Sequence, residues 1–173
     1  MKKVYVLRHA NRDFGKDSLN EEGKQKALQL KNKFNHFDLV FSSPFERCKQ
    51  TANLLTDKEP KVDERAGILE ISDEQKKKIT DLRKSHPFGV AGAILSLEEL
   101  HESARKAGQK LLDLVKEVLS KLPEDGKGLI ISHDGTMVTM EKILKEETFS
   151  QLNKTYHELE GFVVDEQLRL ETA

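Results

Sequence analysis

Cysteine, tryptophan and long apolar runs are scarce or missing in this sequence. Its 173 residues include one cysteine, Cys48, and no tryptophan. One cysteine cannot form an intramolecular disulfide, which excludes the disulfide-rich secreted scaffolds and fits a reducing compartment. No apolar run reaches membrane-spanning length, and the apolar stretch before Arg8 is too short for a signal peptide. We therefore expect a cytoplasmic protein.

An excess of charge of either sign is also missing. Lys and Arg together number 29, and Asp and Glu together number 30. This balance gives no strong net field that would attract nucleic acid or an anionic lipid surface. We expect no nucleic-acid partner and no membrane partner, so any basic site must be local.

Strand-like and helix-like stretches alternate along the chain. With 36% hydrophobic residues, its length suits one domain, residues 1–173, with one buried core. Short β-branched and aromatic runs predict strands, and apolar residues three or four positions apart predict helices. Their order predicts a three-layer α/β/α sandwich with a mainly parallel sheet. The predicted strands lie within 3–8, 37–43, 61–70, 126–132 and, as a pair, 161–172; the predicted helices are 20–34, 44–55, 97–122 and 136–146.

Residues 71–96 do not follow this pattern. The part from 72 to 88 is rich in charge and predicts a solvent-exposed helix ended by Pro87. The part from 89 to 96 is rich in small residues and predicts a flexible loop or a cap over a site. Substrate specificity is expected to depend on this region.

Reactive side chains follow the two strongest predicted strands. "VYVLRH" ends in Arg8 and His9, and "LIISHD" ends in His133 and Asp134. The second predicted strand, within 37–43, leads into the predicted helix 44–55, which carries Arg47. Ligands of open α/β sheets bind at the carboxyl ends of the strands, and guanidinium groups match the oxygens of a phosphoryl group. The sequence therefore predicts a phosphate pocket that contains a histidine nucleophile.

Five segments in this order resemble the histidine phosphatase superfamily, which includes cofactor-dependent phosphoglycerate mutases, phosphohistidine phosphatases and acid phosphatases. The resemblance implies a phosphoglycerate mutase-like fold and covers most of the chain apart from 71–96. The segments are "VLRHANRD", "SLNEEGKQKALQL", "FDLVFSSPFERCKQTANLL", "VDERAGILE" and "LIISHDG".

The resemblance assigns roles to five residues. His9 is similar to the phosphorylated nucleophile, Arg8 and Arg47 to phosphate ligands, and His133 to the second histidine of the phosphate pocket. Asn11 stands where a polar contact to phosphate is common in the family. We expect His9 to be neutral and His133 to be cationic beside phosphate. No metal or cofactor is expected, because arginines supply the positive charge that phosphoryl transfer needs.

The general acid has two candidates. Glu70, in "ILE", resembles the glutamate of the simpler branch of the family, whereas Asp134, after the second histidine, resembles the aspartate of the acid-phosphatase branch. Arg12 also resembles an additional phosphate ligand of that second branch. We place Glu70 ahead of Asp134 because of the chain length and the segment around Arg47. A family glycine is replaced by Ala10, which questions a positive φ there.

The resemblance implies a phosphatase that acts through phosphohistidine on a phosphorylated small molecule or a phosphoprotein. Phosphoglycerate mutase-type transfer is an alternative, although 71–96 has no arginine pair similar to the mutases' carboxylate-binding insertion. A member that has lost catalysis and binds a phosphorylated partner is a second alternative. The sequence leaves the oligomeric state open.

Overall fold

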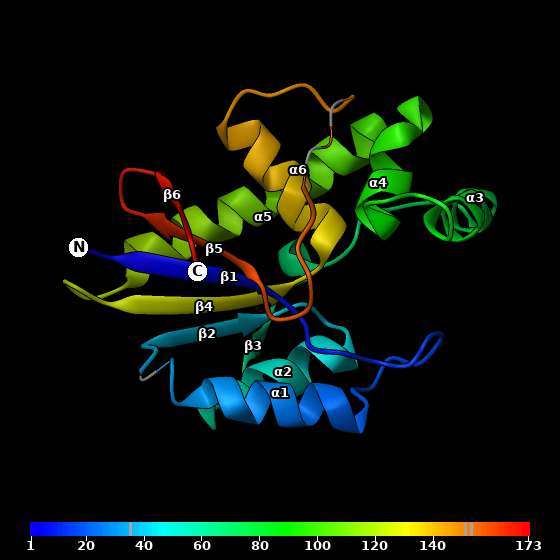
Figure 1. The fold of residues 1–173 in the computed structure, drawn as a ribbon. Helices are drawn as coiled ribbons and strands as arrows, with labels where there is room; N and C mark the ends of the chain where they lie inside the picture. The colour runs from blue at the N-terminus through cyan, green and yellow to red at the C-terminus, as the bar shows by residue number, and fades with distance from the viewer. Residues whose placement is uncertain (35, 151, 153) are drawn as a thin grey trace.

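The computed structural model describes residues 1–34, 36–150, 152 and 154–173. A six-stranded sheet with the order β3-β2-β4-β1-β5-β6 forms its centre (Figure 1). β1, β2, β3 and β4 pair in parallel, and β5 and β6 join antiparallel at one edge. The strands are β1 (Lys3–Arg8), β2 (Leu39–Ser42), β3 (Lys61–Val62), β4 (Lys127–Ser132), β5 (Gly161–Asp165) and β6 (Leu170–Thr172).

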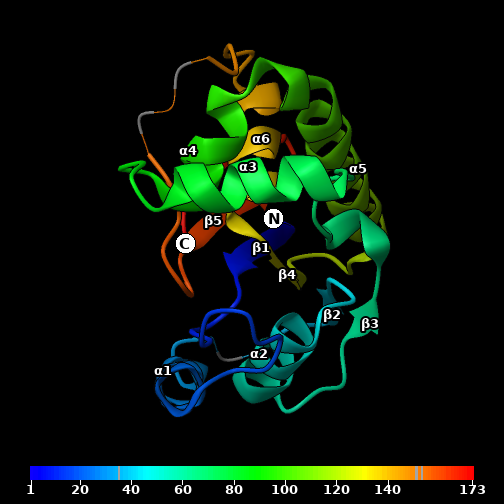
Figure 2. The same ribbon diagram turned by 90° about the vertical axis from the view of Figure 1, so that its right-hand side faces the viewer.

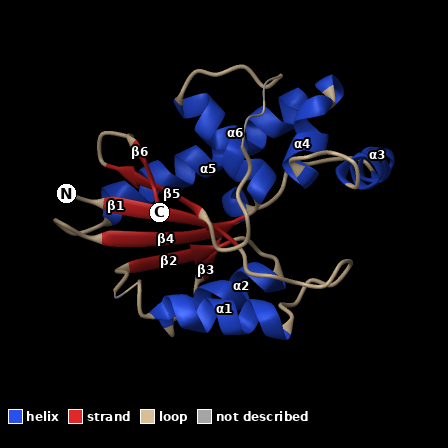
Figure 3. Cartoon of the chain, viewed as in Figure 1, coloured by secondary structure: helices blue, strands red, loops and turns tan. Residues whose placement is uncertain are grey.

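Helices cover both faces of the sheet, as the coloured cartoon in Figure 3 shows. α1 and α2 lie against one face, and α5 and α6 lie against the other (Figure 1). This arrangement confirms the predicted α/β/α sandwich with a mainly parallel sheet. The helices are α1 (Glu21–Lys31), α2 (Glu46–Thr56), α3 (Asp73–Arg83), α4 (Gly89–Ser96), α5 (His101–Lys121) and α6 (Asp134–Leu144), with short 3-10 helices at Glu64–Ala66 and Glu98–Leu100.

The alternation of side chains along each strand divides the core into two clusters. In β1, Val4 and Val6 pack with α5 and α6, whereas Leu7 packs with α1 and α2. In β4, Ile130 belongs to the first cluster and Ile131 to the second. Successive side chains of a strand point to opposite faces, so a sheet buried on both sides needs continuous apolar runs.

Local signals place the helix starts. The side chain of Asn20 accepts a hydrogen bond from the amide of Gly23, so Asn20 is the N-cap of α1. Ser72 and Gln75 form a capping box at the start of α3. The long helix predicted over 97–122 is α5, preceded by one 3-10 turn. No helix in the described ranges is long and apolar enough to cross a membrane.

The prediction of a flexible loop over 89–96 is wrong. This segment is the helix α4, and its residues Ala91 to Leu95 are buried. Its small and apolar side chains pack against α3, α5 and α6, which compensates for the helix-weakening glycines. Figures 1 and 2 show α3 and α4 beside one end of the sheet, where the strands of the parallel part end. The two helices therefore cover the carboxyl edge as a cap.

Candidate active site

The carboxyl ends of β1 and β4 bring the two predicted histidines together. These strands are adjacent, with Arg8 opposite Ser132. The amide of His9 donates to the carbonyl oxygen of Ser132 over 3.2 Å, so the register continues one residue past β1. The ring centroids of His9 and His133 are 5.5 Å apart. Sheet pairing therefore places both imidazoles at one edge.

Two hydrogen bonds fix the tautomer of His9. Its Nδ1 lies 2.8 Å from the carbonyl oxygen of Ala10, and its Nε2 lies 3.2 Å from Nε of Arg47. A carbonyl can only accept and a guanidinium can only donate, so Nδ1 carries the proton and Nε2 carries the lone pair. Burial, above all, lowers the pKa of His9 to about 3. His9 is therefore neutral at physiological pH, with its nucleophilic nitrogen directed at a cation.

Ala10 supports this geometry without an unusual backbone. Its φ is not among the positive values of the chain, so the family glycine is not needed here for its conformational freedom. The amide of Ala10 donates to Oγ1 of Thr51, and its carbonyl accepts from His9. The amide and the carbonyl group of this buried residue therefore both have hydrogen-bond partners in the site.

His133 is held by a hydroxyl and a guanidinium. Its Nε2 lies 2.8 Å from Oγ of Ser43, and its Nδ1 lies 3.3 Å from an Nη of Arg47. Burial, followed by the positive charge of Arg47, lowers the pKa of His133 well below 6.5. Without a bound anion these surroundings favour the neutral ring, and a cationic His133 beside phosphate stays a prediction.

Arg47 connects the two imidazoles. It lies in the first turn of α2 and is almost completely buried. One Nη donates to Asp17 over 2.7 Å, and the guanidinium lies over the ring of Phe45 at 4.4 Å from the centroid. A buried guanidinium needs such partners to be stable.

Arg8 is anchored by the segment that leads into β5. Its Nη1 donates to the carbonyl oxygen of Tyr156 over 2.6 Å, and its Nη2 pairs with Glu158 at 3.3 Å. Its buried Nε has no partner among the described residues. A donor in this state is available to an additional acceptor, such as a phosphoryl oxygen.

A cavity of ≈ 360 Å³ joins these side chains. The α3–α4 cap contributes Arg83, Val90 and Ile94 to its wall. Arg83 and Glu158 were not singled out from the sequence: Arg83 is one basic residue in a charge-rich helix, and Glu158 follows no motif. The remaining wall residues are Arg8, His9, Arg12, Phe14, Arg47, Ile68, Leu69, His133, Asp134, Gly135, Thr136 and Glu158.

Two expected site residues do not line this cavity. Glu70 is 91% exposed in its side chain and pairs with Lys110 at 3.4 Å, so the expectation that Glu70 faces the phosphate pocket is corrected. The side chains of Ser132 and Thr136 hold the carbonyl groups of Ala66 and Gly67, and the chain then turns Glu70 outward. Asn11 is also outside the cavity wall, and its buried Oδ1 has no described partner.

Asp134 is the carboxyl group that lies beside the histidines. It is buried at the start of α6 and lines the cavity. Its Oδ1 accepts from the amide of Tyr156 over 2.8 Å, and its Oδ2 accepts from the hydroxyl of Thr155. Burial raises the pKa of Asp134 against the opposing effect of these hydrogen bonds.

Cys48 is buried on α2 beside His133, and burial raises the pKa of its thiol to about 12. A thiol in this state is a poor nucleophile, so Cys48 acts as a packed structural residue. In the described ranges, no group of three or more His, Cys, Asp and Glu side chains is arranged to hold a metal ion.

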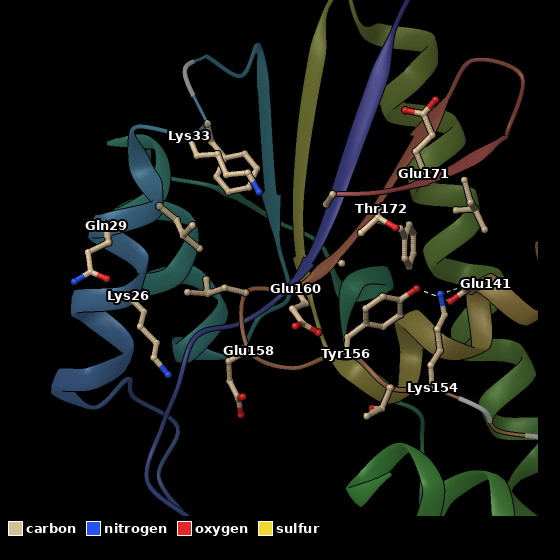
Figure 4. Close-up of a pocket in the computed structure, with 18 of the residues that line it drawn as sticks. Lys26, Gln29, Lys33, Glu141, Lys154, Tyr156, Glu158, Glu160, Glu171 and Thr172 are labelled. Atoms are coloured by element: carbon tan, nitrogen blue, oxygen red, sulfur yellow. Dashed lines mark hydrogen bonds and ion pairs between the residues drawn. The ribbon is translucent and has the colours of Figure 1, made fainter.

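A larger cavity of ≈ 820 Å³ lies on the other side of the 154–160 segment, between α1 and the β5–β6 edge (Figure 4). Its most buried charge, Glu141, accepts from Lys145, Lys154 and the hydroxyl of Tyr156. These partners satisfy the carboxylate, and neither of the two site histidines lines this cavity. The chemistry therefore belongs to the smaller cavity.

A parallel sheet that presents two imidazoles and several guanidinium groups at its carboxyl edge defines an α/β enzyme of phosphoryl chemistry. The model of the histidine phosphatase superfamily (branch 1) matches residues 4–164. The chain therefore belongs to this superfamily, which confirms the resemblance and the enzyme class, a phosphatase. No curated protein matches the sequence significantly.

Solved structures share the fold over their full length. The mycobacterial glucosyl-3-phosphoglycerate phosphatase in complex with inorganic phosphate is similar with a TM-score of 0.74 at 20% identity, covering 100% of this chain and 96% of that one. The phosphoserine phosphatase of Entamoeba histolytica is similar with a TM-score of 0.64 at 22% identity, covering 100% and 95%. At these identities the likeness shows the fold.

Proposed function

We propose that this protein hydrolyses small phosphate monoesters through a phosphohistidine on Nε2 of His9. The observation that carries the proposal is the fixed tautomer of His9. Its Nδ1 proton is held by the Ala10 carbonyl, and its Nε2 lone pair points to Arg47 in a cavity rich in arginine. A neutral imidazole within a cationic pocket is what in-line attack on an anionic phosphorus requires.

In the first step, Nε2 of His9 forms a bond to phosphorus and the bond to the ester oxygen breaks. Arg47 transfers its hydrogen bond from Nε2 to a phosphoryl oxygen, and the free Nε of Arg8 donates to another. These donors stabilise the charge on the equatorial oxygens. The departing oxygen takes a proton from a carboxylic acid of the cavity wall.

In the second step, a water molecule attacks the phosphohistidine. The carboxylate left by the first step accepts a proton from this water. The nitrogen–phosphorus bond breaks, the electron pair returns to Nε2 of His9, and inorganic phosphate leaves. Both groups are then restored for the next turnover.

Asp134 is the proposed acid, in preference to Glu70. Asp134 lines the cavity and has a raised pKa, whereas Glu70 is exposed outside it. The Thr155 hydroxyl that donates to Asp134 can rotate to accept instead, so the same contact suits both protonation states. Glu158 lines the cavity as well, but it pairs with Arg8 and borders the larger cavity.

A small molecule is the proposed substrate rather than a phosphoprotein. A cavity of ≈ 360 Å³ is at the lower end of the range for small-ligand sites, and the α3–α4 cap forms part of its wall. The two named neighbours are phosphatases of small organic phosphates, which supports this choice. We also propose a cytoplasmic location, supported by the single, buried cysteine.

A phosphatase assay with phosphoethanolamine and p-nitrophenyl phosphate tests the proposal, with free phosphate as the readout. Release of inorganic phosphate is expected, together with a ³²P-labelled protein that is stable in alkali and labile in acid. Transfer of the label to a second alcohol without release of phosphate would point to mutase-type chemistry. Saturable binding without turnover would point to a phospho-partner binding module. Either result would contradict the proposal.

A further inference from the structure

Four arginines line the candidate active site, and they fall into two pairs. Arg8 has a carboxylate partner in Glu158, and Arg47 has one in Asp17. Arg12 and Arg83 have no ion pair with any described carboxylate. The cavity thus carries two neutralised arginines beside the histidines and two that lack a counter-charge.

Arg83 reaches the cavity from the cap. Its guanidinium lies over the ring of Phe14 at 4.0 Å from the centroid, and its buried Nε has no hydrogen-bond partner among the described residues. A buried donor without an acceptor is costly unless a ligand supplies one. Phe14 itself is 68% exposed on the loop after β1, and both Phe14 and Arg83 line the cavity.

Arg12 lines the same cavity as the other three arginines. Burial, followed by the positive charges of Arg47 and Arg83, lowers the pKa of Arg12. Its only described hydrogen bond runs from Nη1 to the carbonyl oxygen of Lys16 over 2.7 Å. Guanidinium groups that repel each other in a partly buried site are stabilised by an anion between them.

We infer that Arg83 and Arg12 form a subsite for a second anionic group of the substrate, a carboxylate or a second phosphate. This inference rests on the proposed function and specifies its substrate class: a phosphate monoester with another anion a few bonds from the ester oxygen. The transferred phosphoryl group engages Arg8 and Arg47 at the strand ends, and the second anion engages the cap. Val90 and Ile94 of the cap add apolar side chains to the cavity wall.

Matched substrates test this subsite. Phosphoserine and phosphoethanolamine carry the same phosphorylated oxygen and the same amine and differ by one carboxylate. We expect wild-type protein to have the higher kcat/KM for phosphoserine. Arg83→Gln should lower the ratio of the two kcat/KM values by about tenfold, the loss expected for one charge-assisted hydrogen bond. Lys84→Gln, which removes the same charge at the next, exposed position, should leave the ratio unchanged.

A second comparison separates the two kinds of anion. Fructose 1,6-bisphosphate and fructose 6-phosphate differ by one phosphate. If Arg83→Gln lowers the ratio of kcat/KM values more for this pair than for the phosphoserine pair, the subsite prefers a phosphate; the opposite result assigns it to a carboxylate. An equal loss for all four esters in Arg83→Gln would place Arg83 on the transferred phosphoryl group and overturn the inference. A ratio near one in wild-type protein, or a ratio that the substitution leaves unchanged, would overturn it as well.

A binding readout keeps this test independent of catalysis. Calorimetric titration of the His9→Ala variant with phosphoserine and with phosphoethanolamine measures affinity without turnover. We expect tighter binding of phosphoserine, and loss of that preference in His9→Ala/Arg83→Gln. A preference seen in binding when wild-type protein releases no phosphate would contradict the proposed function but support the subsite. Equal affinities in a protein that hydrolyses both esters would contradict the subsite alone.

Discussion

Arg47 donates through Nε to Nε2 of His9 over 3.2 Å, and one Nη of the same guanidinium lies 3.3 Å from Nδ1 of His133. One side chain therefore sets the orientation and the tautomer of both imidazoles, because a guanidinium can only donate hydrogen bonds. Replacement of Arg47 would release both rings as well as remove a phosphate ligand.

His9→Ala should reduce turnover of phosphoethanolamine below detection, because the nucleophile is lost. Brief incubation of wild-type protein with ³²P-labelled substrate and an alkaline quench should give a labelled protein, and the variant should give none. Circular dichroism controls for folding. Label on a different residue, or turnover in the folded variant, would contradict the mechanism.

Sulfate or vanadate should raise the melting temperature of wild-type protein. An anion that binds only the folded state stabilises it by about 2.7 kcal/mol at a hundredfold excess over Kd. Arg47→Ala should abolish most of this shift in a thermal scan. Lys49→Ala, on the same helix but paired with Glu46 at the surface, is the control and should retain it. A full shift in Arg47→Ala would place the anion elsewhere.

Asp134→Asn should slow esters with poor leaving groups about 10²–10⁴-fold, the usual contribution of a general acid. An activated aryl phosphate should be affected much less, since its leaving group departs without a proton. The measurement is kcat for phosphoethanolamine and for p-nitrophenyl phosphate. Glu70→Gln, which removes an exposed carboxylate, should change neither rate appreciably; the reverse pattern would restore Glu70 as the acid.

The free energy of unfolding should fall as the pH falls from about 6.5 towards 4. His9 titrates near 3 in the folded protein and His133 well below 6.5, so in this window the unfolded chain binds more protons than the folded one. Each group then contributes up to about 1.4 kcal/mol per pH unit. Asp134 has the opposite effect just above pH 3.8: its pKa is raised in the folded protein, so its protonation there stabilises the folded state as the pH falls.

Urea unfolding at several pH values measures this slope. His133→Asn should make it shallower, because asparagine does not titrate. His157→Asn is the matched control, since His157 is exposed and has no described side-chain contact, and it should leave the slope unchanged. An identical slope in His133→Asn would show that other groups cause the acid destabilisation.

Gly23→Ala should destabilise the protein by about 1–3 kcal/mol, the range for overpacked sites. A Cβ at Gly23 would lie 2.2 Å from the backbone oxygen of Asn11, in the loop that follows His9. Helix propensity alone predicts the opposite sign, since alanine favours a helix interior over glycine by about 1 kcal/mol. Chemical denaturation decides between them, with Gln25→Ala as the exposed control on α1; a stabilised Gly23→Ala variant would contradict the close approach.

The sequence by itself determined the layers of the fold and the positions of the two histidines. Short apolar and β-branched runs such as "VYVL" and "LIIS" suit strands covered on both faces, and parallel strands end at one edge. His9 and His133 follow these runs directly, so their meeting depends on strand pairing alone. The spacing of apolar residues likewise predicted the long helix over 97–122, which the structure shows as α5 and the 3-10 turn before it.

Only the tertiary structure decided which carboxyl group faces the cavity and which cap residues join it. The sequence offers two carboxyl groups, Glu70 and Asp134, as candidates for the acid. In the structure, Ser132 and Thr136 donate hydrogen bonds to the carbonyl groups of Ala66 and Gly67, and Glu70 lies in solvent beyond them. Arg83 is one charge among many on α3, and only the packing of α3 on α4 places it in the cavity wall. Such choices depend on contacts between segments far apart in the chain, and local periodicity carries no information about them.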